Sequence, residues 1–578
     1  MKEKVVKLIK IGFIIIWLAA IYGTKTSYIS YLVLGLMGGI SVSLLKGADQ
    51  QQTPEKDKVI IGCIGILFAA MITLGNYDLL LGTNGIMKYG RLLGMLLGGV
   101  VCFKEIFALG YYRLRHVFFT GGHVYTLLQK KCICWGTIAI VFGCNLIYMI
   151  ACVYPASVQY DTLRQMSEIY SENLTNHHPV LLTYLIKWGI DISKALGHGV
   201  TFGIFLSTLV QVIGICLVIG YVMLTLCDMS MCPSILLMFL VFFLICPFNI
   251  CFITYAQKDA PFAYAILLYI VALYRLIKDV GNYKVNTILM VVGALLAAVL
   301  RSNGLMMVLI TLFVIVLQHI HNKKRIVCGM LLVVVMAILY KGPVLQALDV
   351  EPTEYSEGLS IPIQQIGRVV YDQLPLTQHE EEMISALIDM DSVRYHNPYD
   401  PHCSDHIKGI IQFGGKDSYL KEHKGEYLKL WIQLGIKYPK EYLAAYIDET
   451  YGYWLPGVGD CGFQHSYLYN AGDYQIYQVI RCEWLETIIN KYLSLFEQGG
   501  VLHILVENGL AVYLLFYLCV LCIWKKNGLM TLCVPNLAGI LTLLLSTPLY
   551  GNQRYTVYMF VTMPFIALVT FYEKESKK

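Results

Sequence analysis

The stretch FGIFLSTLVQVIGICLVIGYVMLTL occupies residues 202–226 and contains no charged side chain. An uninterrupted apolar run of this length predicts a helix that spans a membrane. The chain as a whole has the same character, because its 578 residues are 57% hydrophobic and its mean hydropathy is +0.60. The net charge of +5 is too small and too dispersed to indicate nucleic-acid binding. We therefore predict an all-α polytopic protein of the cell membrane.

Similar apolar runs recur along the chain and predict about fourteen transmembrane helices. The fourth is the weakest, because Lys104 and Glu105 interrupt it. The predicted spans lie at about 7–24, 28–45, 59–76, 90–109, 134–153, 202–226, 233–252, 260–275, 286–301, 303–320, 326–341, 502–523, 529–548 and 555–572.

Short basic clusters set the expected orientation, since loops rich in Lys and Arg stay in the cytoplasm. With fourteen spans and a cytoplasmic N-terminus, every such cluster falls on the cytoplasmic side, and so does the C-terminus. The other polar segments then fall outside, at 154–201, 253–259, 301–303, 342–501 and 549–554. The unusual polar residues are therefore expected to meet at one face of the membrane.

Four regions follow from this division. Residues 1–130 are predicted to be accessory transmembrane helices, and 131–341 a transmembrane core with 154–201 as its first exterior loop. Residues 342–501 show helical apolar spacing and predict a mainly helical extracytoplasmic domain. Residues 502–578 are predicted to be the C-terminal transmembrane helices.

Asp161 is the best-placed carboxylate of the first exterior loop. It follows Tyr154-Pro155 and opens a helical-looking stretch, DTLRQMSEIY. One interpretation is an N-cap of that helix. The other is a general base that takes a proton from a hydroxyl nucleophile.

Further polar motifs accompany this carboxylate at the predicted outer face. Each has a structural alternative: a helix start, a loop ion pair, a turn, a residue that reaches to the interface, or ordinary packing. Their functional interpretation is the binding of phosphate or sugar. These substrate-binding candidates are His177 and His178 in NHHP, Lys258 and Asp259 in QKD, Arg301 and Asn303 in RSNG, Gln364, Gln365 and Arg368 in SIPIQQIGR, and Arg554 and Tyr555 in NQRY.

The arrangement resembles the GT-C superfamily of integral membrane glycosyltransferases, which includes protein O-mannosyltransferases and aminoarabinose transferases. The resemblance lies in an Asp early in the first exterior loop, an HP-type motif before an amphipathic helix, and an RY at the outer end of a late span. It is closest to an uncharacterised bacterial membrane protein family of this type, in which YPxxxxYDTxxQ, NHHP, QKD, RSNG, LSIPIQQIGRVV and GNQRY look characteristic. This closer likeness covers about residues 150–578.

The resemblance implies a sugar transferred from a polyprenyl-phosphate donor to an extracytoplasmic acceptor, such as a cell-envelope polymer, a glycolipid or a protein. It implies Asp161 as the catalytic base of an inverting reaction, and Lys258, Arg301 and Arg554 as phosphate-binding residues. Many GT-C enzymes carry an acidic pair in this loop, whereas Asp161 has no acidic neighbour. No cofactor is therefore assigned, and a divalent cation stays an open alternative.

Three other functions remain open from the sequence. A transporter or flippase of a lipid-linked substrate is the main alternative, although no inverted repeat is visible and few ionisable residues lie at mid-span. A non-catalytic membrane scaffold is the second. An acyltransferase that uses His177 or His178 is the third.

Overall fold

The computed structural model describes the chain except for residues 1, 24–27, 46–53, 78–84, 119–120, 396–398, 459–461, 464–470, 498–499, 527, 547–548 and 573–578. Within the described residues the fold is helical, and extended backbone occurs only as isolated bridges. The predicted all-α class is confirmed.

Among the residues that the structure describes, eight helices are long and apolar enough to cross a membrane, which is the mark of a multi-pass membrane protein. They are α4 (Glu55–Gly75), α6 (Ile86–Leu109), α7 (Leu127–Ala151), α10 (Val200–Asp228), α13 (Asp259–Ile277), α14 (Tyr283–Leu300), α16 (Lys323–Leu339) and α26 (Asn508–Lys525). Five shorter apolar helices are α2 (Tyr28–Leu44), α11 (Pro233–Ile245), α15 (Ser302–Leu317), α27 (Val534–Leu545) and α28 (Val557–Thr570). Together with α1 (Lys2–Ile21), a helix lies at each of the fourteen predicted spans, while the number of membrane crossings stays a prediction.

Two predicted spans have boundaries that the structure corrects. The run 233–252 is two helices, because α11 ends before Cys246 and α12 (Pro247–Phe252) begins at a proline. Proline has no backbone N–H and keeps the preceding residue out of the helical region. The run 326–341 continues instead, through a π-helical turn (Tyr340–Val344) into α17 (Leu345–Ala347). This continuous helical stretch therefore ends at Ala347, inside the region 342–501 that was predicted to be the exterior domain.

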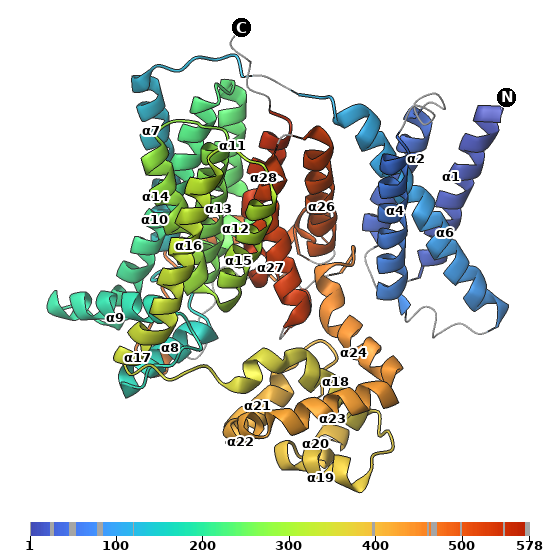
Figure 1. Cartoon of the computed structure of the whole chain (residues 1–578). Coiled ribbons are helices and arrows are strands. Elements are labelled where there is room, and N and C mark those ends of the chain that lie inside the picture. The colour runs from blue at the N-terminus through green and yellow to red at the C-terminus, as the bar shows by residue number, and fades with distance from the viewer. Residues whose placement is uncertain are drawn as a thin grey trace.

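Helix α13 is the centre of the bundle. Apart from Pro261, all of its residues from Asp259 to Ile277 are buried, and the helix packs against α10, α14 and α28. The N-terminal helices α1, α2, α4 and α6 stand beside this core and face α26 (Figure 1). Phe68 of α4 contacts Tyr513 of α26 with ring centroids 4.3 Å apart, and the Ser30 hydroxyl donates to the Glu507 carboxylate at 2.6 Å.

Of the two charges that interrupt the fourth predicted span, Lys104 is exposed and Glu105 is accommodated by pairing. Glu105 of α6 is buried, and its carboxylate lies 2.7 Å from the Lys10 ammonium of α1. A paired carboxylate costs far less to bury than an isolated one. This ion pair explains how α6 continues through a charged position.

The polar segments gather at one end of the bundle (Figure 1). There α8 (Tyr160–Ser171) and α9 (Val180–Ala195) form the first loop, with α9 lying across the bundle end. Below them a smaller helical domain has its own apolar core. Its helices are α18 (Ser360–Tyr371), α19 (Gln378–Leu387), α20 (Met390–Tyr395), α21 (Asp405–Phe413), α22 (Asp417–Glu422), α23 (Lys424–Lys437) and α24 (Pro439–Thr450).

Gly304 has a packing role instead of the turn role that its position suggests. It lies inside the first turn of α15, and a Cβ atom there would overlap the carbonyl of Ala297 in α14. We expect Gly304→Ala to lower the free energy of unfolding by about 1–3 kcal/mol, because the two helices must separate. Thermal unfolding in lipid nanodiscs measures this. Gly143→Ala, at an α7 glycine with open space around it, is the control and should be neutral or slightly stabilising.

Glu449 of α24 makes the stability of the exterior domain depend on pH. Burial raises its pKa to about 8, against the opposing effects of Ser404 and Lys408. Between the ordinary glutamate pKa of 4.5 and the folded-state pKa of about 8, the folded state holds a proton that the unfolded state has lost. The free energy of unfolding should therefore fall by about 1.4 kcal/mol for each pH unit in this window. We expect Glu449→Gln to remove this slope, so that its Tm exceeds that of the wild type at pH 8 and above. An unchanged slope in the variant would contradict this, and the exposed Glu382→Gln is the control.

Candidate functional site

A cavity of about 620 Å³ opens at the bundle end that carries the exterior domain. Its wall is built from the start of α8, the loop before α9, the start of α13, the junction of α14 and α15, and the residues before α28. It is completed by Lys341, the end of α27, the segment 353–358 and helix α21 of the exterior domain. Each polar segment that was predicted to lie at the outer face of the membrane therefore contributes residues to the cavity wall. The SIPIQQIGR motif, within the segment 342–501, does not.

Asp161 reaches this cavity because two loops are hydrogen-bonded to each other. Ser157 exchanges backbone hydrogen bonds with the segment at Thr254 and Ala256, and the Thr162 hydroxyl donates to the Ala256 carbonyl at 2.7 Å. These bonds hold the first turn of α8 beside Lys258. The N-cap of α8 is Gln159, so the capping interpretation of Asp161 does not apply.

Asp161 lies between two cations. Its Oδ2 atom accepts a hydrogen bond from Arg554 Nη2 at 2.8 Å and lies 3.4 Å from Lys258 Nζ. Lys258 ends the loop before α13, and Arg554 lies in a short 3-10 helix (Gln553–Tyr555) before α28. Residues nearly 400 positions apart in the sequence thus meet at one carboxylate.

Asp259 continues this chain of charges into the protein. Its Oδ2 accepts a hydrogen bond from Arg554 Nε at 3.0 Å, and its Oδ1 lies 3.0 Å from Arg301 Nη2. The Asp259 side chain is only 1% exposed. We call this alternating set of Lys258, Asp161, Arg554, Asp259 and Arg301 the charge ladder. Three cations against two carboxylates leave it with one positive charge.

The charge ladder sets the protonation of Asp161, Arg554 and the neighbouring His178. Burial alone would raise the pKa of Asp161, but Lys258 and Arg554 hold it well below its usual range. Burial opposes the charge of Arg554, yet Asp259 and Asp161 raise its pKa. His178 is buried and hydrogen-bonded to Lys258 at 3.2 Å, and burial together with Lys258 lowers its pKa well below the usual value. His178 is therefore neutral, with Nδ1 accepting from the ammonium.

Two further predicted residues, Arg301 and Asn303, line the cavity. Arg301 carries its guanidinium 4.7 Å from the ring centroid of Tyr555, and the Asn303 amide donates to the Thr542 hydroxyl at 3.2 Å, both at the cavity wall.

Gln364, Gln365 and Arg368 are not among the cavity-lining residues. Gln364 donates to the Asp400 carbonyl and Gln365 to the Tyr442 carbonyl at 3.0 Å, while Arg368 pairs with Asp372 and Asp448. Packing within the exterior domain accounts for all three, so their proposed role in substrate binding has no support from their position.

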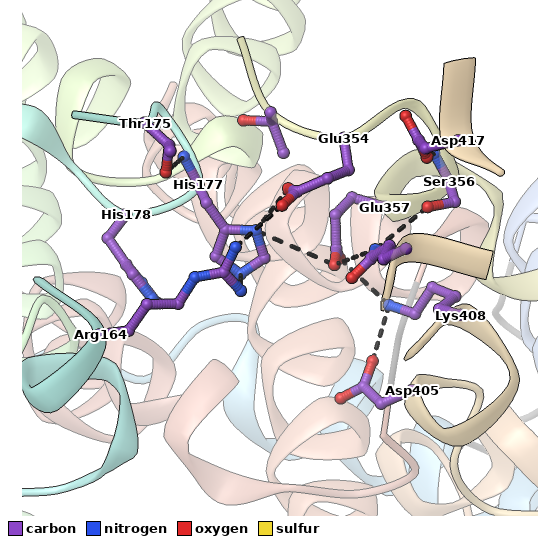
Figure 2. A network of polar contacts seen from close by, with 12 residues as sticks. Arg164, Thr175, His177, His178, Glu354, Ser356, Glu357, Asp405, Lys408 and Asp417 are labelled. Carbon is purple, nitrogen blue, oxygen red and sulfur yellow. Dashed lines mark hydrogen bonds and ion pairs between the residues drawn. The ribbon is translucent and has the colours of Figure 1, made fainter. Parts of the chain in front are cut away.

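A second polar cluster lies at the cavity wall and contains His177, the only member that the sequence analysis predicted as a site residue (Figure 2). We call Arg164, His177, Glu354, Glu357, Asp405 and Lys408 the carboxylate network. The His177 Nδ1 atom lies 2.9 Å from Glu354 Oε2, and Arg164 Nη2 donates to Glu354 Oε1 at 2.8 Å. Hydrogen bonding from His177 lowers the pKa of Glu354 to about 2. Lys408 Nζ lies 3.1 Å from Glu357 and 2.7 Å from Asp405.

Comparison with known proteins places the chain in a family. A family model described as "Family of unknown function (DUF6020)" matches residues 166–578. The chain belongs to this DUF6020 family. No curated protein and no solved structure matches it. The DUF6020 match includes the charge ladder except for Asp161, which lies just before the matched region.

Asp259 should be essential for folding, because it is the only partner in the charge ladder shared by two guanidiniums. Removing one member of a buried ion pair leaves uncompensated charge and costs about 3–5 kcal/mol. We expect Asp259→Asn to lower the Tm strongly, as measured by thermal unfolding in nanodiscs. Asp349→Asn, at an exposed position of the same bundle end, should leave the Tm unchanged. Equal Tm values for both variants would contradict the role of Asp259.

Proposed function

We propose that the protein is a GT-C-type membrane glycosyltransferase. It transfers a sugar from a polyprenyl-phosphate donor to an extracytoplasmic acceptor, which is a cell-envelope polymer, a glycolipid or a protein. The observation that carries this proposal is Asp161, a carboxylate held between Lys258 and Arg554 at a cavity beside the ends of apolar helices. Perturbed ionisable groups in a cavity are typical of reaction sites.

The charge ladder supports an anionic donor. Lys258, Arg301 and Arg554 line the cavity, and one positive charge is left unbalanced by Asp161 and Asp259. Guanidinium and ammonium groups bind phosphate through charge-assisted hydrogen bonds. Leu300 and Leu543 line the same cavity and offer an apolar surface for the first part of a lipid chain.

The proposed reaction uses Asp161 as the general base. The Asp161 carboxylate takes the proton of an acceptor hydroxyl, whose oxygen forms a bond to the anomeric carbon. The bond from that carbon to the phosphate oxygen breaks on the opposite side, and the electron pair leaves with the polyprenyl phosphate. Cations already fixed around the phosphate stabilise the charge that develops on it. Attack from the face opposite the leaving group inverts the anomeric centre.

The resting geometry links donor binding to the strength of the base. While Lys258 and Arg554 contact Asp161, the carboxylate is a poor proton acceptor, because their charges lower its pKa. A phosphate that binds the same two cations competes with Asp161 for them. Donor binding therefore raises the basicity of Asp161 at the moment when a base is needed.

The proposal includes the orientation expected from the sequence. Fourteen spans with both termini in the cytoplasm put the cavity and residues 342–501 outside, where lipid-linked donors and envelope acceptors meet. The flippase and scaffold functions are the alternatives, and both predict that no sugar is released from any donor.

The deciding experiment measures release of polyprenyl phosphate from a panel of polyprenyl-phosphate sugars. The purified full chain is placed in lipid nanodiscs with cell-envelope extract as the acceptor source. We expect release by the wild type and a loss of roughly 10²-fold or more in Asp161→Asn, the scale of general-base catalysis. The matched control is Asp191→Asn, at an exposed position of α9, which should retain wild-type release.

Three outcomes would count against the proposed function or against Asp161 as its general base. Wild-type release in Asp161→Asn removes Asp161 from the reaction. An equal loss in Asp191→Asn shows that the effect is not specific. No release by the folded wild type from any donor favours the flippase or the scaffold. Thermal unfolding of each variant shows whether it is folded, since Asn leaves Lys258 and Arg554 without their carboxylate.

A further inference from the structure

Three residues of the carboxylate network are potential ligands of one metal ion. His177 Nδ1 lies 2.9 Å from Glu354 Oε2 and 4.0 Å from Glu357 Oε1, and one ligand atom from each residue lies within 4.8 Å of the others. Ligands about 2.0–2.2 Å from a common ion are about 3–3.6 Å apart. Small side-chain movements therefore bring all three atoms to one ion.

Backbone pairing brings these ligands together from distant parts of the chain. Asn176 N donates to the Glu351 carbonyl and Glu351 N to the Leu174 carbonyl, both at 2.8 Å. This pairing fixes the loop before His177 against the segment that leads to Glu354. The ligands thus connect the first loop to the exterior domain.

The two carboxylates are oriented by cations on their outer oxygens (Figure 2). Arg164 donates to Oε1 of Glu354, while Oε2 faces His177. Lys408 donates to Oε2 of Glu357, while Oε1 faces His177 and accepts from Gln412 at 2.9 Å. Metal-binding carboxylates are commonly held in this way by hydrogen bonds from an outer layer of residues.

The charge around this centre is negative. Among the residues that the structure describes, the carboxylates of Glu354, Glu357 and Asp405 pair with two cations, Arg164 and Lys408. Asp417 adds a further carboxylate, which accepts from the backbone N–H groups of residues 355 and 356 at 2.7 and 2.9 Å. These four carboxylates and two cations carry two net negative charges, which one divalent cation balances.

We propose that His177, Glu354 and Glu357 bind a divalent transition-metal ion of the Mn²⁺ or Zn²⁺ class. One imidazole nitrogen with two carboxylate oxygens suits these ions better than the oxygen-only sites of Mg²⁺ and Ca²⁺. The ion ties the first loop to the exterior domain at the wall of the cavity. The site does not depend on the transferase function.

Binding requires a tautomer change that the structure defines. Arg164 Nη1 lies 3.3 Å from His177 Nε2 and can only donate, so Nε2 is the acceptor and Nδ1 carries the proton. When the ion takes Nδ1, the ring proton moves to Nε2 and Arg164 Nη1 moves away from it. Arg164 keeps its hydrogen bond to Glu354 through Nη2.

The test measures Mn²⁺ binding to the full chain in nanodiscs after chelator dialysis. The electron paramagnetic resonance signal of free Mn²⁺ reports binding, and Zn²⁺ is added as competitor. We expect one site in the wild type, weakened about 10-fold or more in His177→Gln and in Glu357→Gln. The controls His198→Gln and Glu382→Gln, both at exposed positions, should bind as the wild type does.

Thermal unfolding supplies a second readout that does not depend on activity. Mn²⁺ or Zn²⁺ should raise the Tm of the wild type and of both controls, but not that of the two ligand variants at the same concentration. The Tm without metal shows whether each variant is folded, and Glu354→Gln replaces one that is not. The proposal is overturned if the folded wild type binds neither ion at about 1 mM, or if the ligand variants bind as tightly as the controls.

Discussion

The buried carboxylate of Asp259 is the constraint on which the cavity depends. An isolated charge at this depth would cost several kcal/mol, and Asp259 avoids that cost because Arg301 and Arg554 both reach it. Its own position starts α13, Arg301 joins α14 to α15, and Arg554 precedes α28. Satisfying one carboxylate therefore fixes the ends of four helices at the same level. Arg554, which Asp259 holds in place, in turn contacts Asp161, and Asp161 contacts Lys258.

Much of this arrangement could be predicted from the sequence, because its causes are local. Apolar runs predict helices wherever they occur, and a helix lies at each predicted run. Charged residues at the ends of such runs are conspicuous, since charge near hydrocarbon is costly. Asp161, Lys258, Arg301 and Arg554 stood out for this reason. Their pairing could not be predicted, because it depends on how helices hundreds of residues apart pack together.

The residues that the sequence did not reveal, and the predictions that position does not support, have the same physical origin. Glu354, Glu357 and Lys408 lie in polar segments where charge is ordinary, so nothing in the sequence marked them. Their significance comes from partners such as Arg164, which lies 190 residues from Glu354. Gln364 showed the converse, because an amide beside an apolar strip suggested a ligand, whereas its partner is a backbone carbonyl of the same domain. Residue type and spacing predict where a helix or a span end lies, but not which polar groups satisfy one another.

The two clusters give the cavity wall two regions of opposite charge. The charge ladder has an excess of positive charge and the carboxylate network an excess of negative charge, and residues of both line the same wall. An anionic group inside is drawn to the ladder and repelled by the network, so its orientation is set before any specific contact forms. A divalent cation bound, as proposed, by His177, Glu354 and Glu357 would weaken this polarity, and its occupancy would then control how strongly the cavity orients a ligand. His177 belongs to the carboxylate network, and the adjacent His178 contacts Lys258 of the charge ladder, so a movement of this one loop acts on both clusters together.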